Sequence, residues 1–326
     1  MPVAPDGYDH PMPKHSPIPV LTVEVIAALR AGSPGVSRLI DGTVGGGGHS
    51  LALLEAGIAS ALACDRDWRA IETARRRLAI YGERVRFYHG SYVDMANAAG
   101  AMGWHRVDAI LLDLGLSSLQ LDDPARGFSF RFDAPLDMRF DRDEGGETAA
   151  DLVNRLPVDE LADLFYRYGE ERHSRRIARE VARQRPIKSA RALGEAVARA
   201  LPAHANRKSK IHPATKVFQA LRIAVNGELA ALEQVIPVAV ELLRPGGRLA
   251  IIAFHSLEDR LVKQAFKRLS TSVASPPGMA SIAERRASVR LVNRRPIRPA
   301  EEEARANPRS RSANLRVVEK LQAPLT

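Results

Sequence analysis

Short apolar runs alternate with amphipathic segments over the first third of the chain. The apolar runs, which predict strands, lie at residues 37–41, 60–65, 85–90 and 107–113. Residues 20–31 and 68–81, and a segment that begins near residue 50, have the spacing of helices with one apolar face. Strands that alternate with helices form a parallel sheet covered on both faces, so we expect a doubly wound, Rossmann-like α/β fold.

The pattern changes near residue 122 and returns near residue 213. Helical periodicity without clear strands extends from residue 148 to residue 201. Further on we expect a helix at 213–243, a turn at 244–247, and strands at 248–254 and 313–319. The chain is therefore predicted to contain a flexible N-terminal arm, a discontinuous α/β domain and an inserted helical domain. Their predicted boundaries are 1–19 for the arm, 20–122 and 213–326 for the α/β domain, and 123–212 for the insertion.

A glycine-rich loop with a carboxylate in front of it follows the first predicted strand. It runs from Asp41 through Gly45 and Gly47 to His49, and a second carboxylate, Asp65, ends the next strand. Glycines let the backbone approach a nucleoside ligand closely. A dinucleotide pyrophosphate gains nothing from Asp41, whereas the ammonium and sulfonium groups of S-adenosylmethionine do. The loop resembles that of class I methyltransferases, and it favours S-adenosylmethionine over NAD, which stays open as the alternative.

Composition narrows the class of partner. The chain has 326 residues, of which 45% are hydrophobic, and a formal net charge of +10. This surplus of basic residues indicates an anionic partner. The single cysteine, Cys64, excludes an intrachain disulfide, and no apolar run has the length of a membrane span. We expect a cytoplasmic protein that does not enter a membrane, and the sequence leaves its oligomeric state open.

Seven motifs, in this order along nearly the whole chain, resemble the MraW family of bacterial ribosomal RNA methyltransferases. They are DLGLSSLQLDD at 113–123, RGFSF at 126–130, PLDMR at 135–139, YGEER at 168–172, HPATKVFQALRIAVN at 212–226, FHSLEDR at 254–260 and NPRSRSA at 307–313. No single motif is specific enough, but the ordered set is. The resemblance implies a class I S-adenosylmethionine-dependent methyltransferase fold with an inserted helical domain.

The resemblance also implies an activity and a set of cofactor contacts. The family methylates the N4 amine of a cytidine in the decoding centre, the P-site region, of 16S ribosomal RNA. Its contacts to S-adenosylmethionine fall here on Gly47, Gly48, His49, Asp65, Tyr92, Asp113 and Gln120. Three positions depart from the family pattern: Tyr92 stands where phenylalanine is usual, Leu119 where proline is usual, and Pro17 where histidine is usual.

Two residues are candidates for the chemistry. Many amino-methyltransferases have an Asp/Asn-Pro-Pro-aromatic motif after the fourth strand, but here Asp113-Leu114-Gly115-Leu116 holds that place. We expect Asp113, or the Leu114 carbonyl, to accept a hydrogen bond from the amine, with a purely cofactor-binding Asp113 as the alternative. His255 follows the fifth predicted strand and could accept or relay a proton. Its alternative is a hydrogen-bonded turn residue.

Three basic segments are candidates for binding RNA. In residues 167–191, four arginines follow one another at helical spacing and predict a single stripe. A second segment, residues 285–316, contains ten arginines, and a short patch precedes residue 212. The predicted RNA contacts are Arg172, Arg176, Arg179 and Arg183, then Arg207, Lys208 and Lys210, and finally Arg309 and Arg311. Ordinary solvated surface is the alternative for each segment.

The sequence therefore predicts a methyltransferase that acts on 16S ribosomal RNA or the small ribosomal subunit. The histidines and the one cysteine have no spacing typical of a metal site, so we expect no metal. The alternatives from other classes are an NAD-dependent oxidoreductase, a DNA methyltransferase, and a non-catalytic, RNA-binding ribosome assembly factor on a methyltransferase fold.

Overall fold

The computed structural model describes residues 19–30, 37–201, 212–272 and 286–322. Its sheet has seven strands in the order β3-β2-β1-β4-β5-β7-β6, in which β1 to β5 are parallel and β6 and β7 are antiparallel to their neighbours. The strands are β1 Arg38–Asp41, β2 Ser60–Asp65, β3 Val85–His89, β4 Val107–Asp113, β5 Leu243–Ala253, β6 Val289–Leu291 and β7 Asn314–Lys320. The predicted doubly wound fold of a class I methyltransferase is confirmed.

Helices cover both faces of this sheet because its strands are apolar on both sides. Ile40 and Leu62 point to one face and Leu39 and Ala61 to the other, each into a separate buried cluster. On the first face lie α4 (Met95–Ala101), α12 (Glu228–Leu242) and α13 (Ser256–Leu269). On the second lie α1 (Thr22–Arg30), α2 (Gly48–Glu55) and α3 (Trp68–Leu78).

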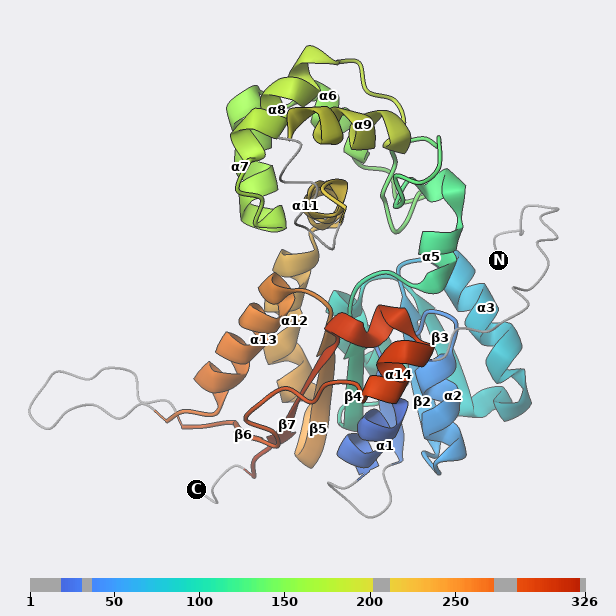
Figure 1. Cartoon of the computed structure of the whole chain (residues 1–326). Helices are drawn as coiled ribbons and strands as arrows, with labels where there is room; N and C mark the ends of the chain where they lie inside the picture. The colour runs from blue at the N-terminus through green and yellow to red at the C-terminus, as the bar shows by residue number, and fades with distance from the viewer. Residues whose placement is uncertain (1–18, 31–36, 202–211, 273–285, 323–326) are drawn as a thin grey trace, which may run out of the picture.

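A helical part lies at the other end of the molecule from the sheet (Figure 1). It consists of α6 Ala149–Arg155, α7 Val158–Gly169, α8 Ser174–Arg183, α9 Ala190–Ala200 and α11 Ala214–Asn226. These helices share a third core that runs from Phe128 to Leu221. The core thus continues beyond residue 212, since α11 packs on α7. The proposed division of the chain at residues 122 and 212 stays a prediction.

Two expected elements after residue 212 have a different form. The predicted helix at 213–243 is two helices, α11 and α12, which are bent by 56° at Gly227. Gly227 has φ of 63°, a left-handed conformation that ends α11 and that glycine adopts without strain. The predicted turn at 244–247 is a bulge inside β5, because Val107 pairs with Leu243 while Ala109 pairs with Arg248. Apolar helical periodicity continues through Gly227, which hid the break between α11 and α12.

The C-terminal segment returns to the carboxyl end of the sheet. The late strand β7 is confirmed, and the sequence missed β6 and the helix α14 (Glu301–Ala306). Glu303 accepts a hydrogen bond at 2.8 Å from the backbone nitrogen of Leu21, which enters α1. The segment therefore fixes the first described residues beside the sheet, whereas the predicted arm lies almost wholly outside the described residues.

No single helix among the described residues is long and apolar enough to cross a membrane. The bent pair of α11 and α12 reaches that length and apolarity only when the two helices are taken together.

Candidate active site

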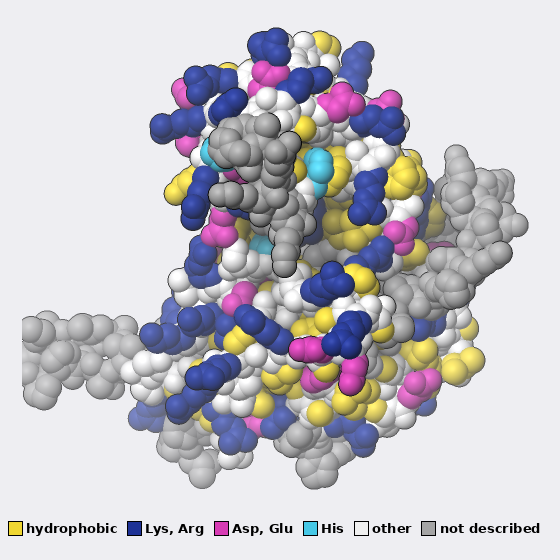
Figure 2. Space-filling view, viewed as in Figure 1, with side chains coloured by type: hydrophobic (Ala, Val, Ile, Leu, Met, Phe, Trp, Pro, Cys, Tyr) yellow, Lys and Arg dark blue, Asp and Glu magenta, His cyan; other side chains and the backbone are white. Residues whose placement is uncertain are grey.

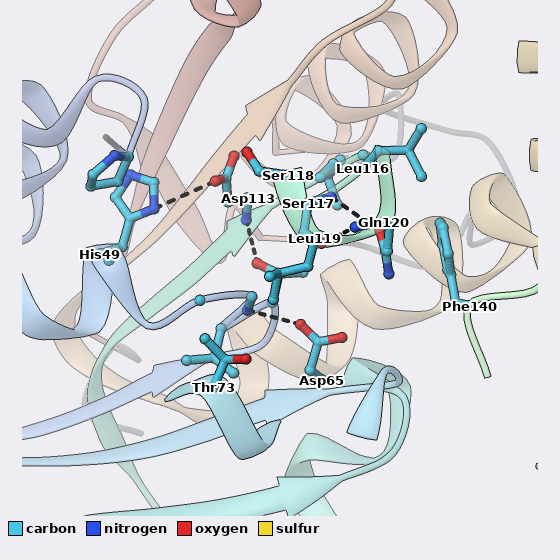
Figure 3. A pocket seen from close by; sticks show the side chains of 18 of the residues that line it. His49, Asp65, Thr73, Asp113, Leu116, Ser117, Ser118, Leu119, Gln120 and Phe140 are labelled. Atoms are coloured by element: carbon cyan, nitrogen blue, oxygen red, sulfur yellow. Dashed lines mark hydrogen bonds and ion pairs between the residues drawn. The ribbon is translucent and has the colours of Figure 1, made fainter. Parts of the chain in front are cut away.

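A cavity of about 990 Å³ opens at the carboxyl ends of the parallel strands (Figure 3). This is the place where doubly wound sheets bind ligands, and its volume is at the upper end of the range of about 300–1,000 Å³ for such sites. The loop after β1, the ends of β2 and β4, and the segment 114–120 line it, together with residues 306–309. The cavity lining therefore combines the glycine loop with parts of three motifs that carry the family resemblance, at 113–123, 254–260 and 307–313.

The glycines of the loop have separate tasks. Gly45, with φ of 51°, lines the cavity and donates its N–H to Asp65 at 2.8 Å. Gly48 lines it too, and a Cβ there would come within 3.1 Å of Pro19. Gly47 is not among the lining residues. It has φ of 78°, and a Cβ there would lie 3.3 Å from the backbone of Ala74, so it lets α3 pack closely against the loop.

Asp41 does not face the cavity, contrary to its predicted contact with the cofactor. The side chain is 1% exposed. Its oxygens accept hydrogen bonds from the Ser50 hydroxyl at 2.7 Å and from the Thr43 backbone at 3.2 Å. Burial raises the pKa of this carboxyl, and the Ser50 hydrogen bond opposes the rise. Asp41 therefore shapes the loop from behind.

Asp65 ends β2 and faces the cavity, as predicted. One carboxyl oxygen accepts the Gly45 N–H at 2.8 Å and the other accepts the Asp67 N–H at 2.9 Å. Burial raises the pKa of Asp65 to about 7, against the effect of these two hydrogen bonds. Both oxygens keep further lone pairs, so the carboxylate can still accept hydrogen bonds from ribose hydroxyls.

Asp113 ends β4 in the middle of the cavity. Its backbone nitrogen donates to Thr43 Oγ1 at 2.6 Å, and its Oδ2 lies 3.4 Å from Nδ1 of His49. Its Oδ1 is buried and has no hydrogen-bond partner among the described residues. Burial raises the pKa of Asp113 to about 7, and the negative charge of Glu258 adds to the rise. Among the described residues that line the cavity, only Asp113 has a buried side-chain polar atom without a hydrogen-bond partner.

A polar chain connects the cavity floor to the helical part. Gln120, on the short helix α5 (Ser118–Asp122), lines the cavity and donates to Asp67 at 3.2 Å. Asp67 is also paired with Arg126 at 2.8 Å. Arg126 in turn donates to the carbonyl of Phe140 at 2.7 Å, and the Phe140 ring lines the cavity. One buried arginine thus holds an aromatic side chain over the site.

Part of the cavity lining is acidic. Glu228 and Glu258 line it beside Tyr92, and both carboxyls are less than a tenth exposed. Arg222 lies against Glu228 in a bidentate pair at 2.8 and 2.9 Å. Burial raises the pKa of the Tyr92 hydroxyl, and the two glutamates add to the rise. Tyr92 therefore stays protonated and can donate a hydrogen bond at neutral pH.

His255 is not among the residues that line the cavity. It is the N-cap of α13, where its Nδ1 accepts from the backbone nitrogen of Glu258 at 3.4 Å. Its Nε2 lies 3.1 Å from Oε1 of the same glutamate. These contacts fit the alternative of a hydrogen-bonded turn residue, and a role of His255 in the chemistry stays a prediction.

The predicted RNA-binding arginines lie on different surfaces. Arg176, Arg179 and Arg183 are exposed on α8, whereas Arg172 precedes this helix. Arg311 is exposed, and Arg309 lies at the cavity, paired with Asp122 at 2.8 Å. The three basic positions Arg207, Lys208 and Lys210 lie outside the described residues.

No group of three or more His, Cys, Asp or Glu side chains in the described part of the chain could hold a metal ion. The expectation that the activity needs no metal stays a prediction.

Comparison with known proteins decides the family. The family model described as the MraW methylase family matches residues 14–321. The chain belongs to the MraW methylase family. It is therefore a methyltransferase, and its cofactor is S-adenosylmethionine, as the glycine loop and Asp65 had indicated. The NAD-dependent alternative is excluded.

Two relatives align with more than nine tenths of this chain. A protein of Thermomicrobium roseum, named ribosomal RNA small subunit methyltransferase H, is 50% identical over 94% of both chains. A protein of Syntrophotalea carbinolica with the same name is 48% identical over 93% of this chain and 97% of its own. Among solved structures, an rRNA methylase of Streptococcus thermophilus matches 92% of this chain and 94% of its own with a TM-score of 0.40 and 12% identity.

The lining residues that the sequence did not indicate include Phe140, Glu228 and Glu258. Glu258 lies inside the FHSLEDR motif, in which His255 was the predicted candidate for the chemistry. Glu228 follows the motif that ends at Asn226, and the break at Gly227 that turns it toward the cavity was not foreseen. Phe140 comes directly after the PLDMR motif. Its position next to this motif is the one sequence signal that could have indicated it.

Proposed function

We propose that this methyltransferase transfers a methyl group to the N4 amine of a cytidine in the decoding centre of 16S ribosomal RNA. The names of its full-length relatives support the small-subunit RNA as substrate. The observation that supports an amine as the methyl acceptor is that the cavity is rich in hydrogen-bond acceptors. Asp113 has an oxygen without a hydrogen-bond partner among the described residues, and two glutamates line the same cavity. An amine carries hydrogens that such acceptors can bind.

The bound cofactor supplies an electrophilic methyl group. The cavity residues then have to hold the amine in line with it, and such positioning can account for several kcal/mol of the barrier. The N4 nitrogen forms the new bond to carbon while the carbon–sulfur bond breaks and its electron pair stays on sulfur. Asp113, or the Leu114 carbonyl, accepts a hydrogen bond from the amine, and the surplus proton leaves to the carboxylate or to water. Phe140 and Phe254 line the cavity as aromatic surfaces on which an extruded base can stack.

The cofactor is held by the residues that the sequence indicated and that line the cavity. They are Gly45, Gly48, His49, Asp65, Tyr92, Asp113 and Gln120. Asp65 is placed to bind the ribose. Asp41 and Gly47 support the loop without lining it.

The helical part is proposed as the substrate-binding domain. Figure 2 shows Lys and Arg side chains gathered over it at the top of the molecule. On α8 the exposed arginines 176, 179 and 183 provide positive charge for RNA phosphates. Side chains read A-form grooves poorly, so the RNA fold and the splayed target base should supply the specificity.

The test is methyl transfer from labelled S-adenosylmethionine to small ribosomal subunits that lack the modification, followed by mass spectrometry of nucleosides and mapping of the site. A single N4-methylcytidine in the decoding centre is expected. Free 16S RNA and DNA of the same sequence, offered in competition, separate the substrate classes. No product despite tight binding of cofactor and subunit would instead favour a non-catalytic assembly factor.

A further inference from the structure

The hydrogen bonds of His49 fix which of its ring nitrogens carries a proton. Its Nε2 lies 2.8 Å from the carbonyl oxygen of Val20 in a buried contact. A carbonyl oxygen can only accept a hydrogen bond, so Nε2 must donate. In the neutral ring, Nδ1 then has no proton and presents a lone pair. That lone pair faces Oδ2 of Asp113 at 3.4 Å.

Two lone pairs that face one another at this distance repel, so a proton between them stabilises the contact. Nothing else neutralises the carboxylate, because no Lys or Arg in the described part of the chain is paired with Asp113. Its Oδ1 is buried and has no hydrogen-bond partner in the described ranges, which also disfavours the charged form. Burial raises the pKa of Asp113 to about 7 and lowers that of His49, which places the proton on the carboxyl.

We propose that His49 and Asp113 together hold one proton in the cofactor-free protein and release it when the cationic cofactor binds. S-adenosylmethionine has a sulfonium charge that the product S-adenosylhomocysteine lacks. The pair therefore adapts the charge of the site to the methyl donor, and it leaves Asp113 as a carboxylate in the loaded enzyme. An ionised Asp113 accepts hydrogen bonds with both oxygens, whereas the protonated form also presents a donor.

The other charged groups around the pair favour this assignment. Asp113 faces Glu258 of α13, and His49 faces Glu303 of α14. Asp41, behind the loop, acts on both residues. All three are acidic, so each favours retention of a proton by the pair until a cation arrives.

Asp65 is the competing source of a released proton, because burial raises its pKa to about 7 as well. However, both of its oxygens accept backbone N–H groups, which stabilise its charged form. It also lies at the predicted ribose position, which the methyl donor and the product share. A proton released from Asp65 would thus accompany both ligands equally.

Calorimetric titration in buffers of different ionisation enthalpy measures the protons released on binding. At pH 6.5 we expect S-adenosylmethionine to release about half to three-quarters of a proton more than S-adenosylhomocysteine. The affinity for the methyl donor should also weaken as the pH falls below 7, by up to about tenfold per pH unit, relative to the product. Both ligands carry the same amino acid group, so its own titration cancels in the difference. Equal proton release by the two ligands would overturn the proposal.

Two matched variants assign the proton. Asp113→Asn should abolish the difference between the ligands, whereas Asp65→Asn should leave it intact. The reverse result would place the proton on Asp65 and end the proposal.

A measurement without cofactor tests the proposal even if a variant binds the cofactor poorly. The carboxyl carbon of Asp113 is followed by nuclear magnetic resonance in the free wild-type protein and is assigned by its loss in Asp113→Asn. Its titration midpoint should lie near neutral pH and move lower by about one unit in His49→Leu, which removes the acceptor nitrogen. His89→Leu, whose histidine lies near Asp141 outside the lining, is the control. A midpoint below pH 5, or one that His49→Leu leaves unchanged, contradicts the shared proton.

Discussion

Two aspartates beside the same cavity, Asp67 and Asp113, are neutralised in opposite ways. Asp67 is 2% exposed, accepts from Gln120 at 3.2 Å and is paired with Arg126 at 2.8 Å. Asp113 has only His49 at 3.4 Å, and one of its oxygens has no hydrogen-bond partner among the described residues. The hydrogen bonds of the Asp67 carboxylate are made within the protein, whereas the Asp113 carboxylate can still accept one from a ligand.

The comparison shows that proximity to a cavity does not identify a ligand-binding carboxylate, whereas its set of partners does. The set of partners also distinguishes a glutamate of the cavity lining. Glu228 faces Arg222 in a bidentate pair that links α11 to α12 across the bend at Gly227. Paired carboxylates thus contribute to the fold, whereas Asp113 keeps an oxygen without a hydrogen-bond partner among the described residues.

The largest expected effect concerns Asp67, the aspartate in an ion pair. Arg126→Met leaves Asp67 buried without its cation, and loss of one partner of a buried ion pair costs about 3–5 kcal/mol. Chemical denaturation should show this loss in the free energy of unfolding. Arg69→Met is the control, because the pair of Arg69 with Asp123 is partly exposed and should be worth less than about 1 kcal/mol. Similar losses in the two variants would remove the distinction between the pairs.

The next effect concerns the open side. Asp113→Asn keeps the shape of the side chain and removes its charge, so turnover should fall by about 10²–10³-fold, as for other electrostatic groups of an active site. Stability at neutral pH should not fall, since a buried and unsatisfied carboxylate is lost. Single-turnover rates and cofactor affinity are measured separately. Intact turnover would show that the charge of Asp113 is not essential.

The fold was predictable because its signals are local. Each strand of the parallel sheet is a short apolar run, and the glycine loop lies directly after the first of them. The roles of the acidic residues were harder to predict, since Asp41, Asp65 and Asp113 all end strands. Only the paths of the loops decide that Asp41 turns behind the glycines while the other two face the cavity. The break at Gly227 was missed because apolar periodicity continues through it.

Two adjacent glycines test the division of tasks within the loop. Gly47→Ala places a side chain at φ of 78° and against the backbone of Ala74, so it should destabilise the protein by about 1–3 kcal/mol. Gly46→Ala meets nothing within 4 Å and has no positive φ, so stability should change little. Since Gly46 lines the cavity, its variant should act on cofactor affinity instead. Equal melting temperatures of the two variants would contradict this division.

The open carboxyls also predict a pH dependence of stability. The pKa values of Asp65 and Asp113 are raised to about 7 in the folded protein, above the ordinary value near 4 in the unfolded chain. Their contribution to stability is therefore full below pH 4 and is lost as the pH rises through 7. Between pH 5 and 8 the free wild-type protein should lose about 2–3 kcal/mol relative to Asp113→Asn in denaturation experiments. A constant difference between the two proteins would mean that Asp113 titrates normally.

The smallest effect concerns the surface of the helical part, where charge is neither buried nor needed for folding. Replacing exposed Arg176 and Arg179 of α8 by Gln should weaken binding to small subunits by a few-fold and reduce the salt dependence of binding by about one unit of slope per lost phosphate contact. Stability should stay within about 0.5 kcal/mol of wild type. Arg305→Gln, on α14 and paired with Glu301, is the control for total charge. If Arg305→Gln weakens binding as much, per charge removed, as the α8 variant does, then the net charge of the protein rather than the α8 surface attracts the RNA.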